Sequence, residues 1–206
     1  MNSLKFLKQD SDLEQYVHPH ALSKDWVNYI EMVKKNDVPL DLILTPVFSN
    51  KMCQELIDIG EEHGYKNYED ALDYTKQDIM LNELPEWQQL INRIIKKYVY
   101  RVVEHFWNNS HKANLYDKHF GFLLKYDSDG EMTESTPHND GSQYTLLVCL
   151  NDGFEGGGTR YPAQNVTVRP EIGYGCIHPV CNRRHGGQTT TRGVRHIYSA
   201  FIGGSL

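Results

Sequence analysis

The stretch Thr136-Pro-His-Asn-Asp-Gly-Ser-Gln-Tyr-Thr145 carries a histidine and an aspartate two residues apart, just before an apolar run. Residues i and i+2 of an extended segment point to the same side, so His138 and Asp140 could bind one metal ion from the end of a strand. The same triplet also suits a polar turn in which the aspartate caps its own backbone. Taken alone, the triplet leaves both interpretations open.

A later segment, His185-Gly-Gly-Gln-Thr-Thr-Thr-Arg-Gly-Val-Arg195, favours the metal interpretation because it supplies a second histidine and an arginine. Two histidines and one carboxylate are the ligand set preferred by a non-haem Fe(II) that must also bind a cosubstrate and oxygen. On a strand leaving the metal, Arg195 could form a bidentate pair with the distal carboxylate of a dicarboxylic cosubstrate. The pattern thus predicts a metal site with an adjacent anion site.

The composition is typical of one compact domain, since 39% of the 206 residues are apolar and 23% are charged. A net charge of -6 argues against a broad nucleic-acid-binding face and suits a basic substrate better. The four cysteines lack CxxC spacing, and Cys149 lies in an apolar run, which favours buried reduced thiols. Because the chain shows no signal-peptide pattern and no apolar run of about 20 residues, we expect a soluble cytoplasmic protein without membrane contacts.

Residues 1–118 are predicted to be mainly helical and residues 119–206 to form the β core of a single domain. Apolar residues spaced by three and four predict a helix over Ala21 to Asn36. Ser49 can cap a helix that ends at Gly64, after a short extended segment from Asp41 to Phe48. A long amphipathic helix should begin at Pro85 and run to Asn108.

Short β-rich runs separated by glycine and turn residues follow residue 118 and predict a sandwich or jelly roll. The predicted strands are His119 to Tyr126, Gln143 to Leu150, Thr159 to Tyr161, Val166 to Arg169, Gly173 to His178 and Val194 to Ile202. The glycine-rich stretch Gly153 to Thr159 is expected to be a loop, since adjacent glycines cost backbone entropy in a strand.

Over residues 38–202 the chain resembles the Fe(II)- and 2-oxoglutarate-dependent dioxygenases, in particular the procollagen lysyl hydroxylase and prolyl 4-hydroxylase group. The resemblance rests on an ordered series of motifs: LLKYDSDGE, TPHND, YTLLVCLND, FEGGGTRY, GYGCIHP, HGGQTTTRGVRHI and SAFI. It implies a mainly β fold with flanking helices, a double-stranded β-helix (jelly roll) with helices packed on the major sheet.

Carried over by position, the resemblance implies that His138, Asp140 and His185 bind Fe(2+). It implies that Arg195 binds the distal carboxylate of 2-oxoglutarate and that Tyr126 lies near this cosubstrate. The implied reaction uses O2 to convert 2-oxoglutarate to succinate while hydroxylating a peptidyl lysine or proline side chain, with L-ascorbate as an additional cofactor. A peptide or amino-acid substrate is expected, no nucleic acid or membrane partner, and a homodimer stays open.

The chain departs from the lysyl hydroxylase pattern at Gly186, His196 and Leu147, where the family has Glu, Tyr and Asn. Exchange of such supporting residues puts the lysine substrate in doubt while leaving the iron chemistry in place. Nucleic-acid demethylation is disfavoured, because the repair dioxygenases place a second arginine where this chain has Phe201.

Three alternatives stay open at this stage. The same centre could hydroxylate a free amino acid or another small molecule. The chain could also be a non-catalytic β-roll binding module with a vestigial site. Finally, the cluster His178, Cys181 and His185, with Cys176, could bind structural zinc, which requires four tight ligands.

Overall fold

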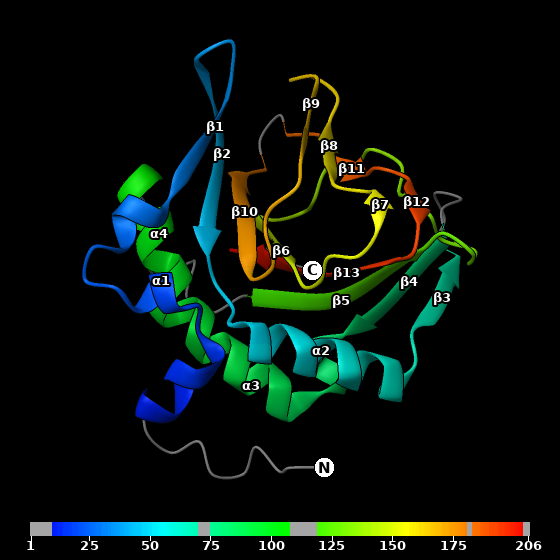
Figure 1. The fold of residues 1–206 in the computed structure, drawn as a ribbon, viewed down its shortest axis with the longest axis horizontal. Helices are drawn as coiled ribbons and strands as arrows, with labels where there is room; N and C mark the ends of the chain where they lie inside the picture. Colours follow the sequence, from blue (N-terminus) through cyan, green and yellow to red (C-terminus); the bar gives the residue numbers. More distant parts are fainter. Residues whose placement is uncertain (1–9, 70–74, 108–118, 181–182, 204–206) are drawn as a thin grey trace.

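The protein is built from two layers of antiparallel β-strands, as the computed structural model of residues 10–69, 75–107, 119–180 and 183–203 shows (Figure 1). One layer is a sheet with the strand order β1-β2-β10-β6-β13-β5-β4-β3, and the other consists of two small sheets, β11-β8-β9 and β12-β7. Helices α2 and α3 lie on one side of the large sheet, and the small sheets face its other side. The predicted jelly roll with helices on the major sheet is confirmed.

The elements have the following bounds. The strands are β1 Glu31–Lys35, β2 Val38–Pro46, β3 Lys66–Glu69, β4 Thr75–Met80, β5 His119–Asp127, β6 Tyr144–Cys149, β7 Glu155–Gly156, β8 Thr159–Tyr161, β9 Val166–Val168, β10 Tyr174–Pro179, β11 Gly186–Gly187, β12 Thr190–Arg192 and β13 Val194–Ile202. The α-helices are α1 Pro19–Leu22, α2 Asn50–His63, α3 Pro85–Ile94 and α4 Tyr100–Trp107, with 3-10 turns at Asp10–Tyr16, Trp26–Tyr29 and Leu81–Glu83.

The six strands predicted after residue 118 are all present, with ends within one residue of the prediction. The expected glycine loop is correct in part. Gly153, Gly157 and Gly158 have positive φ angles and lie outside strands, but Glu155–Gly156 forms the short strand β7, which pairs with β12. Gly156 also has a positive φ of 74°, so its glycine allows a conformation that other residues rarely adopt.

The two predicted helices after residue 48 are confirmed. The Ser49 hydroxyl accepts a hydrogen bond from the Met52 backbone N–H at the start of α2, and Gly64 ends the helix with a φ of 85°. Pro85 begins α3, and the helical path continues through a π turn at Ile95–Val99 into α4. The predicted end at Asn108 lies outside the described residues.

The helix predicted over residues 21–36 is wrong. Its first part forms α1 and a 3-10 turn, and its last part is β1, which pairs with β2 as a hairpin. The hairpin turn consists of Asn36 and Asp37, whose φ angles are 50° and 65°. Two consecutive residues with positive φ form the tight turn that matches the twist of a hairpin, and asparagine and aspartate tolerate it best after glycine.

The helices α1 to α4 all lie before residue 118, as predicted, but the strands β1, β2, β3 and β4 precede residue 118 as well, and β2 contains most of the extended segment predicted from Asp41 to Phe48. These strands pair along both ends of the large sheet. Their apolar residues alternate over too few positions to outweigh the helical spacing around them. The tertiary pairing with β10 and β5 determines their conformation instead.

All six residues of β6 are buried because both faces of this central strand are covered. Tyr144, Leu146 and Val148 join the core between the sheet and the helices. Leu147 belongs to a separate apolar cluster with Tyr126 and its neighbours on the opposite face of the sheet. The period of two in a strand therefore separates a structural core from the interior of the jelly roll.

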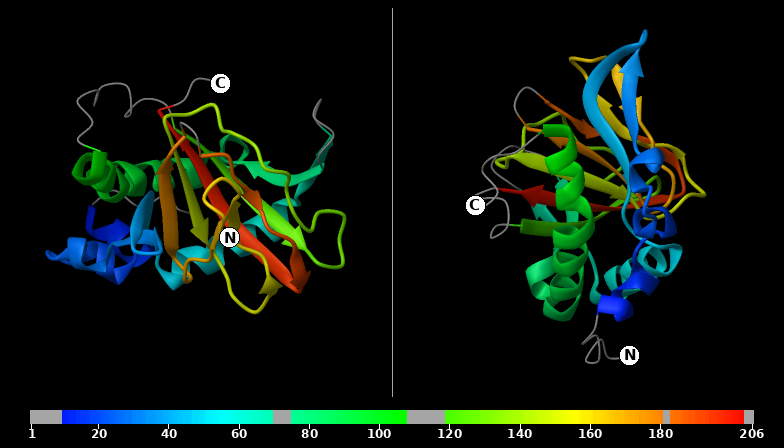
Figure 2. Two further views of the ribbon diagram at one scale, coloured as in Figure 1. Left: turned by 90° about the horizontal axis from the view of Figure 1, so that it is seen from above. Right: turned by 90° about the vertical axis from the view of Figure 1, so that its left-hand side faces the viewer.

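Views along the other two axes show the same layering, with the β1–β2 hairpin projecting from the body of the protein (Figure 2). Cys53, Cys149 and Cys176 are buried free thiols, as expected, whereas Cys181 lies outside the described residues. Within the part of the chain that the structure describes, none of the helices combines the length and apolar character needed to cross a bilayer.

The Asn36–Asp37 turn predicts that Asp37→Gly stabilises the protein. Glycine removes the steric cost of a positive φ, so we expect the free energy of unfolding to rise by up to about 1 kcal/mol. Urea denaturation followed by circular dichroism measures this, with Asp37→Ala as the matched control that should lower stability. A gain for alanine equal to that for glycine would contradict the turn assignment.

Candidate metal and cosubstrate site

Three of the predicted residues converge at one end of the jelly roll. The potential ligand atoms of His138, Asp140 and His185 all lie within 4.8 Å of one another. His138 Nε2 is 3.4 Å from Asp140 Oδ1, and His185 Nε2 is 3.5 Å from Asp140 Oδ2. Asn139 between the ligands is exposed, so the predicted register of the triplet is correct. The expectation that Gly141 and Ser142 begin the next strand is wrong, since β6 begins at Tyr144.

Backbone carbonyls determine which nitrogen of each histidine is available. His138 Nδ1 lies 2.9 Å from Thr136 O, and His185 Nδ1 lies 3.0 Å from Arg183 O. Because a carbonyl can only accept, both Nδ1 atoms must carry a proton, so in the neutral imidazoles the lone pairs are on the Nε2 atoms that face the carboxylate. Such a group of three acceptors is stable only with a cation or additional protons between them, so the donor set fits a metal ion.

Asp140 is held as a carboxylate by its surroundings. Burial alone would raise the pKa of the Asp140 carboxyl, but His138, His185 and Thr145 together bring it below its ordinary value. The Thr145 hydroxyl donates a hydrogen bond to Asp140 Oδ2. Thr145 comes from β6 and so connects the ligand segment to the large sheet. This supporting residue was not predicted, although it ends the stretch that contains the triplet.

Arg195 is the fourth predicted site residue, and it is 4% exposed on β13. Its Nη1 donates to Gly158 O at 3.1 Å, and its guanidinium lies 5.2 Å from the centre of the Tyr126 ring. Among the described residues, no carboxylate forms a salt bridge with Arg195. A buried cation is costly unless it is paired with an anion, so this environment suits an anionic ligand.

Tyr126 is the strand partner of Arg195 across β5 and β13, and it is also buried. Its hydroxyl lies 3.4 Å from Ser135 Oγ. A Cβ atom at Gly187 would approach the Tyr126 ring and hydroxyl to 2.7–2.8 Å, so glycine is needed here for the close approach of backbone and ring. The structure therefore places Tyr126 beside Arg195, and its expected position near the cosubstrate stays a prediction.

The three departures from the family pattern have separate structural explanations. A Cβ atom at Gly186 would lie 2.6 Å from Ser135 O, so this backbone has no room for a larger side chain. Leu147 packs with Tyr126 and Ile197 inside the jelly roll and makes that interior more apolar. His196 points to the opposite face of β13 from Arg195 and takes no part in the metal group.

His196 is instead the centre of a buried polar contact between β13 and α2. Its Nδ1 lies 3.1 Å from the Tyr65 hydroxyl, and its Nε2 lies 3.4 Å from Glu61 Oε1. Burial is the main reason that the pKa of His196 falls to about 4. The imidazole is therefore neutral in the folded protein near neutral pH.

The geometry of the described residues does not support the zinc alternative. The Cys176 thiol lies 3.5 Å from the Tyr161 hydroxyl, and Cys181 lies outside the described residues. The His178 ring packs edge-on against His185, with ring centres 4.9 Å apart. Burial, followed by His185, lowers the pKa of His178 to about 3. Among the described residues, the potential metal group is His138, Asp140 and His185.

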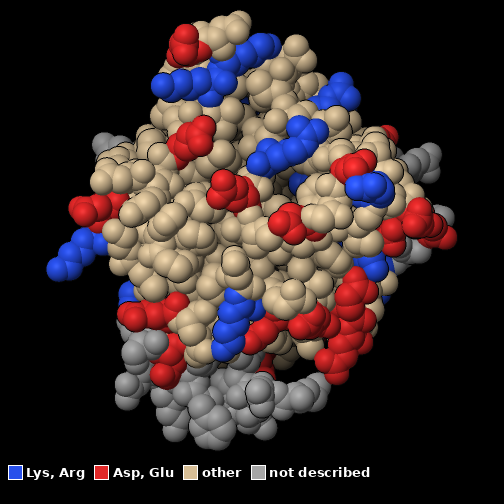
Figure 3. Space-filling view, in the orientation of Figure 1, with Lys and Arg blue, Asp and Glu red and all other residues tan. Residues whose placement is uncertain are grey.

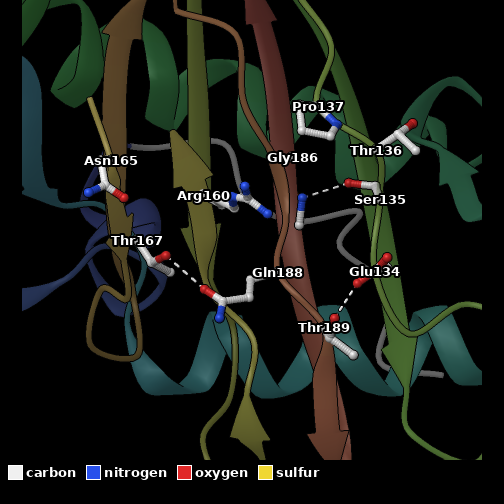
Figure 4. Close-up of a pocket in the computed structure, with 11 residues that line it drawn as sticks. Glu134, Ser135, Thr136, Pro137, Arg160, Asn165, Thr167, Gly186, Gln188 and Thr189 are labelled. Carbon is white, nitrogen blue, oxygen red and sulfur yellow. Dashed lines mark hydrogen bonds between the residues drawn. The ribbon is translucent and has the colours of Figure 1, made fainter. Parts of the chain in front are cut away.

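A polar cavity of about 380 Å³ lies next to the metal group, and Figure 4 shows the residues that line it. Its walls include Pro137 and Gly186, which directly neighbour the ligands His138 and His185 in the sequence. Arg160 points into it, while Glu134 binds the Thr189 hydroxyl at the opposite side. No partner of the Arg160 guanidinium is found among the described residues. The cavity can therefore accept a polar molecule beside the metal group.

The face of the molecule seen in Figure 3 carries acidic and basic side chains side by side. It shows no continuous basic surface of the kind that tracks a phosphate backbone. This agrees with the net negative charge of the chain.

Comparison with known proteins identifies lysyl hydroxylases as homologues. The chain is 28% identical over 179 residues to procollagen-lysine,2-oxoglutarate 5-dioxygenase 1 of Mus musculus, which covers 79% of the chain and 24% of that protein. It is 29% identical over 212 residues to the procollagen lysyl hydroxylase and glycosyltransferase of Acanthamoeba polyphaga mimivirus, covering 92% of the chain and 22% of that protein. The chain thus spans about a quarter of the length of these relatives. No family model matches the chain.

Solved structures support the fold independently. A 2OG-Fe(II) oxygenase family oxidoreductase from Burkholderia pseudomallei superimposes with a TM-score of 0.59 and 13% identity, over 79% of this chain and 85% of the other. The jelly-roll fold is therefore that of the 2OG-Fe(II) oxygenases. The sequence-based resemblance to this group and to the procollagen lysyl hydroxylases is confirmed.

The hydrogen bond from Thr145 to Asp140 predicts that Thr145→Val weakens metal binding. Loss of a group that orients a ligand typically costs 10–100-fold in metal affinity, so we expect about a tenfold increase in the Kd for Mn(II). Titration under anaerobic conditions measures it, and Asp140→Ala should abolish binding. An unchanged Kd for Thr145→Val would show that the hydroxyl does not orient the carboxylate.

The lowered pKa of His196 predicts a specific dependence of stability on pH. In the unfolded chain this histidine titrates near 6.5, so between pH 6.5 and 4 the unfolded state binds a proton that the folded state excludes. Stability is therefore complete above pH 6.5 and is lost as the pH falls towards 4. From pH 6.5 to 5, wild type should lose about 2 kcal/mol more unfolding free energy than His196→Gln. Urea denaturation at each pH measures the unfolding free energy. The same dependence of this free energy on pH in both proteins would contradict the prediction.

Proposed function

We propose that the chain is an Fe(II)- and 2-oxoglutarate-dependent hydroxylase that acts on peptidyl lysine, ahead of peptidyl proline. The balanced reaction converts 2-oxoglutarate, O2 and a C–H bond to succinate, CO2 and a C–OH group. The observation that carries the proposal is the combination of a His-Asp-His group with a buried arginine that has no carboxylate partner among the described residues. These features fit a metal and a dicarboxylate together.

Each site residue has a defined task in this proposal. His138 and His185 bind the metal through Nε2, because their Nδ1 protons are held by backbone carbonyls. Asp140 supplies the negative charge, and Thr145 holds its orientation. The bound iron supplies the redox chemistry with O2.

The remaining side chains arrange the cosubstrate. Arg195 pairs with the distal carboxylate of 2-oxoglutarate, and the Tyr126 ring stacks against the guanidinium and limits its motion. Leu147, Met132 and Ile197 form a dry wall beside them, which strengthens the ion pair by excluding water. The chain thereby fixes both ends of a 2-oxo diacid.

Several features support a lysine side chain of a peptide as the acceptor. The names of the relatives describe procollagen lysine as their substrate. The net charge of the chain is -6, which favours a cationic side chain, and the polar cavity beside the ligands carries both Glu134 and Arg160. Ascorbate is proposed as the reductant that restores Fe(II).

The anchoring role of Arg195 predicts the effect of Arg195→Ala. Removing one member of a buried ion pair costs several kcal/mol, so the affinity for N-oxalylglycine in the metal-loaded protein should fall by on the order of 100-fold. Arg192→Ala is the matched control, because this exposed arginine on β12 pairs with Glu155 and should leave affinity unchanged. Calorimetry under anaerobic conditions measures both. Absence of metal-dependent binding by wild type would refute the proposed function.

The acceptor is identified by turnover with Fe(II), ascorbate and 2-oxoglutarate. We expect succinate formation and a gain of one oxygen atom on lysine-containing peptides, detected by mass spectrometry. Proline-containing peptides and free lysine, proline and arginine are screened in parallel. Oxidation of a free amino acid with no peptide product would replace the peptide assignment with the small-molecule alternative.

A further inference from the structure

Asn151, two residues beyond the end of β6, holds both peptide groups that flank Arg195. Its Oδ1 accepts a hydrogen bond from His196 N at 2.7 Å, and its Nδ2 donates to Val194 O at 2.7 Å. Val194 O belongs to the peptide group before Arg195, and His196 N belongs to the one after it. A single side-chain amide therefore fixes the backbone on both sides of the arginine.

The strand needs this contact because its neighbour ends there. Pairing of β13 with β6 stops at Ile197 and Cys149, whereas pairing with β5 continues through Arg195 to Val194. At Arg195 the backbone would consequently lack a partner on the β6 side. The primary amide of Asn151 directs one N–H donor and its carbonyl acceptor at β13 in the geometry of a peptide group, so it replaces the missing strand residue, while Nδ2 also donates to Asp152 O at 3.0 Å.

The loop that begins at Asn151 also returns to the arginine side chain. Gly158 O, at the other end of this loop, accepts a hydrogen bond from Arg195 Nη1 at 3.1 Å. A Cβ atom at Gly157 would lie 3.0 Å from Arg195 Cδ, so the loop packs closely along the side chain. One end of the loop thus fixes the backbone of Arg195, and the other end fixes its guanidinium.

We propose that Asn151 is a positioning residue for the distal carboxylate of the 2-oxo diacid, acting through Arg195. This inference rests on the proposed function, since it requires Arg195 to bind that carboxylate. A bidentate ion pair depends on the orientation of the guanidinium, so a small shift of the strand weakens it. Asn151 itself touches neither the metal group nor the acceptor cavity among the contacts of the described residues.

The test compares two ligands that chelate the same metal. N-oxalylglycine has a distal carboxylate, whereas oxalate has none. With the Mn(II)-loaded protein, Asn151→Ala should lower the affinity for N-oxalylglycine by about 10-fold, because the guanidinium is no longer held in the orientation that a bidentate ion pair needs. The affinity for oxalate should change by less than about twofold. Asn151→Asp keeps the bond from His196 N and serves as the second variant, with the same selective direction of change.

Two controls separate positioning from a general loss of stability. Ser49→Ala removes the cap of α2 and costs about 1 kcal/mol far from the site, so it should change neither affinity. In the Arg195→Ala background, adding Asn151→Ala should cause no further loss of N-oxalylglycine affinity, because the residue through which Asn151 acts is absent.

Each result has a definite meaning. The positioning role would be overturned if the Asn151 variants lost the same affinity for N-oxalylglycine and for oxalate, or if neither variant had an effect. It would also be overturned if the losses of N-oxalylglycine affinity from Asn151→Ala and Arg195→Ala were fully additive. These outcomes would leave the proposed function intact. Failure of the wild-type protein to bind N-oxalylglycine with metal would overturn both.

Discussion

Two backbone hydrogen bonds between His138 and His185 are the contact on which the site depends. His138 N donates to His185 O at 2.8 Å, and His185 N donates to His138 O at 2.9 Å. This isolated bridge joins a segment before β6 to one after β10, and it sets the spacing of the two imidazoles. Asp140 then enters from the same segment as His138, and the glycines beyond His185 allow Tyr126 and Ser135 to approach. The ligand group exists because two distant segments pair in one register.

The interior of the jelly roll and its core are built from the same strands. In β6, Thr145 supports the metal group, while Leu146 and Val148 pack towards the helices. In β13, Arg195 faces the interior and His196 contacts Tyr65 from the helix side. Stability of the sheet and geometry of the site therefore share one backbone. A substitution in the core can displace a site residue without touching it.

Much of the fold and the site could be predicted because the signals are local. The Ser49 cap, Pro85 and the strands after residue 118 each depend on a few neighbouring residues. The ligand triplet and Arg195 were recognisable from residue type, order and family resemblance. The β1–β2 hairpin was missed because its apolar residues also fit a helical period, and its Asn36–Asp37 turn was not recognised.

The supporting residues were harder to find because their roles arise from tertiary pairing. Nothing in the sequence around Asn151 shows that β13 continues past the point where its pairing with β6 ends. Likewise, Thr145 and Gly158 O matter through partners that lie far away in the chain. An asparagine directly after an apolar strand was the available signal, but it is common at ordinary turns as well.

The alternation along β13 gives this strand an unusual safeguard against misfolding. A slip of one residue against β5 would turn Arg195 towards the apolar core and His196 towards the interior. The slipped sheet would place the guanidinium where His196 now contacts Tyr65 and Glu61, and it would turn the buried core residues of β13 towards the interior of the jelly roll. The register that places Arg195 in the interior is thus the same one that buries the core residues of β13, so the anion site and the core penalise the same wrong pairing.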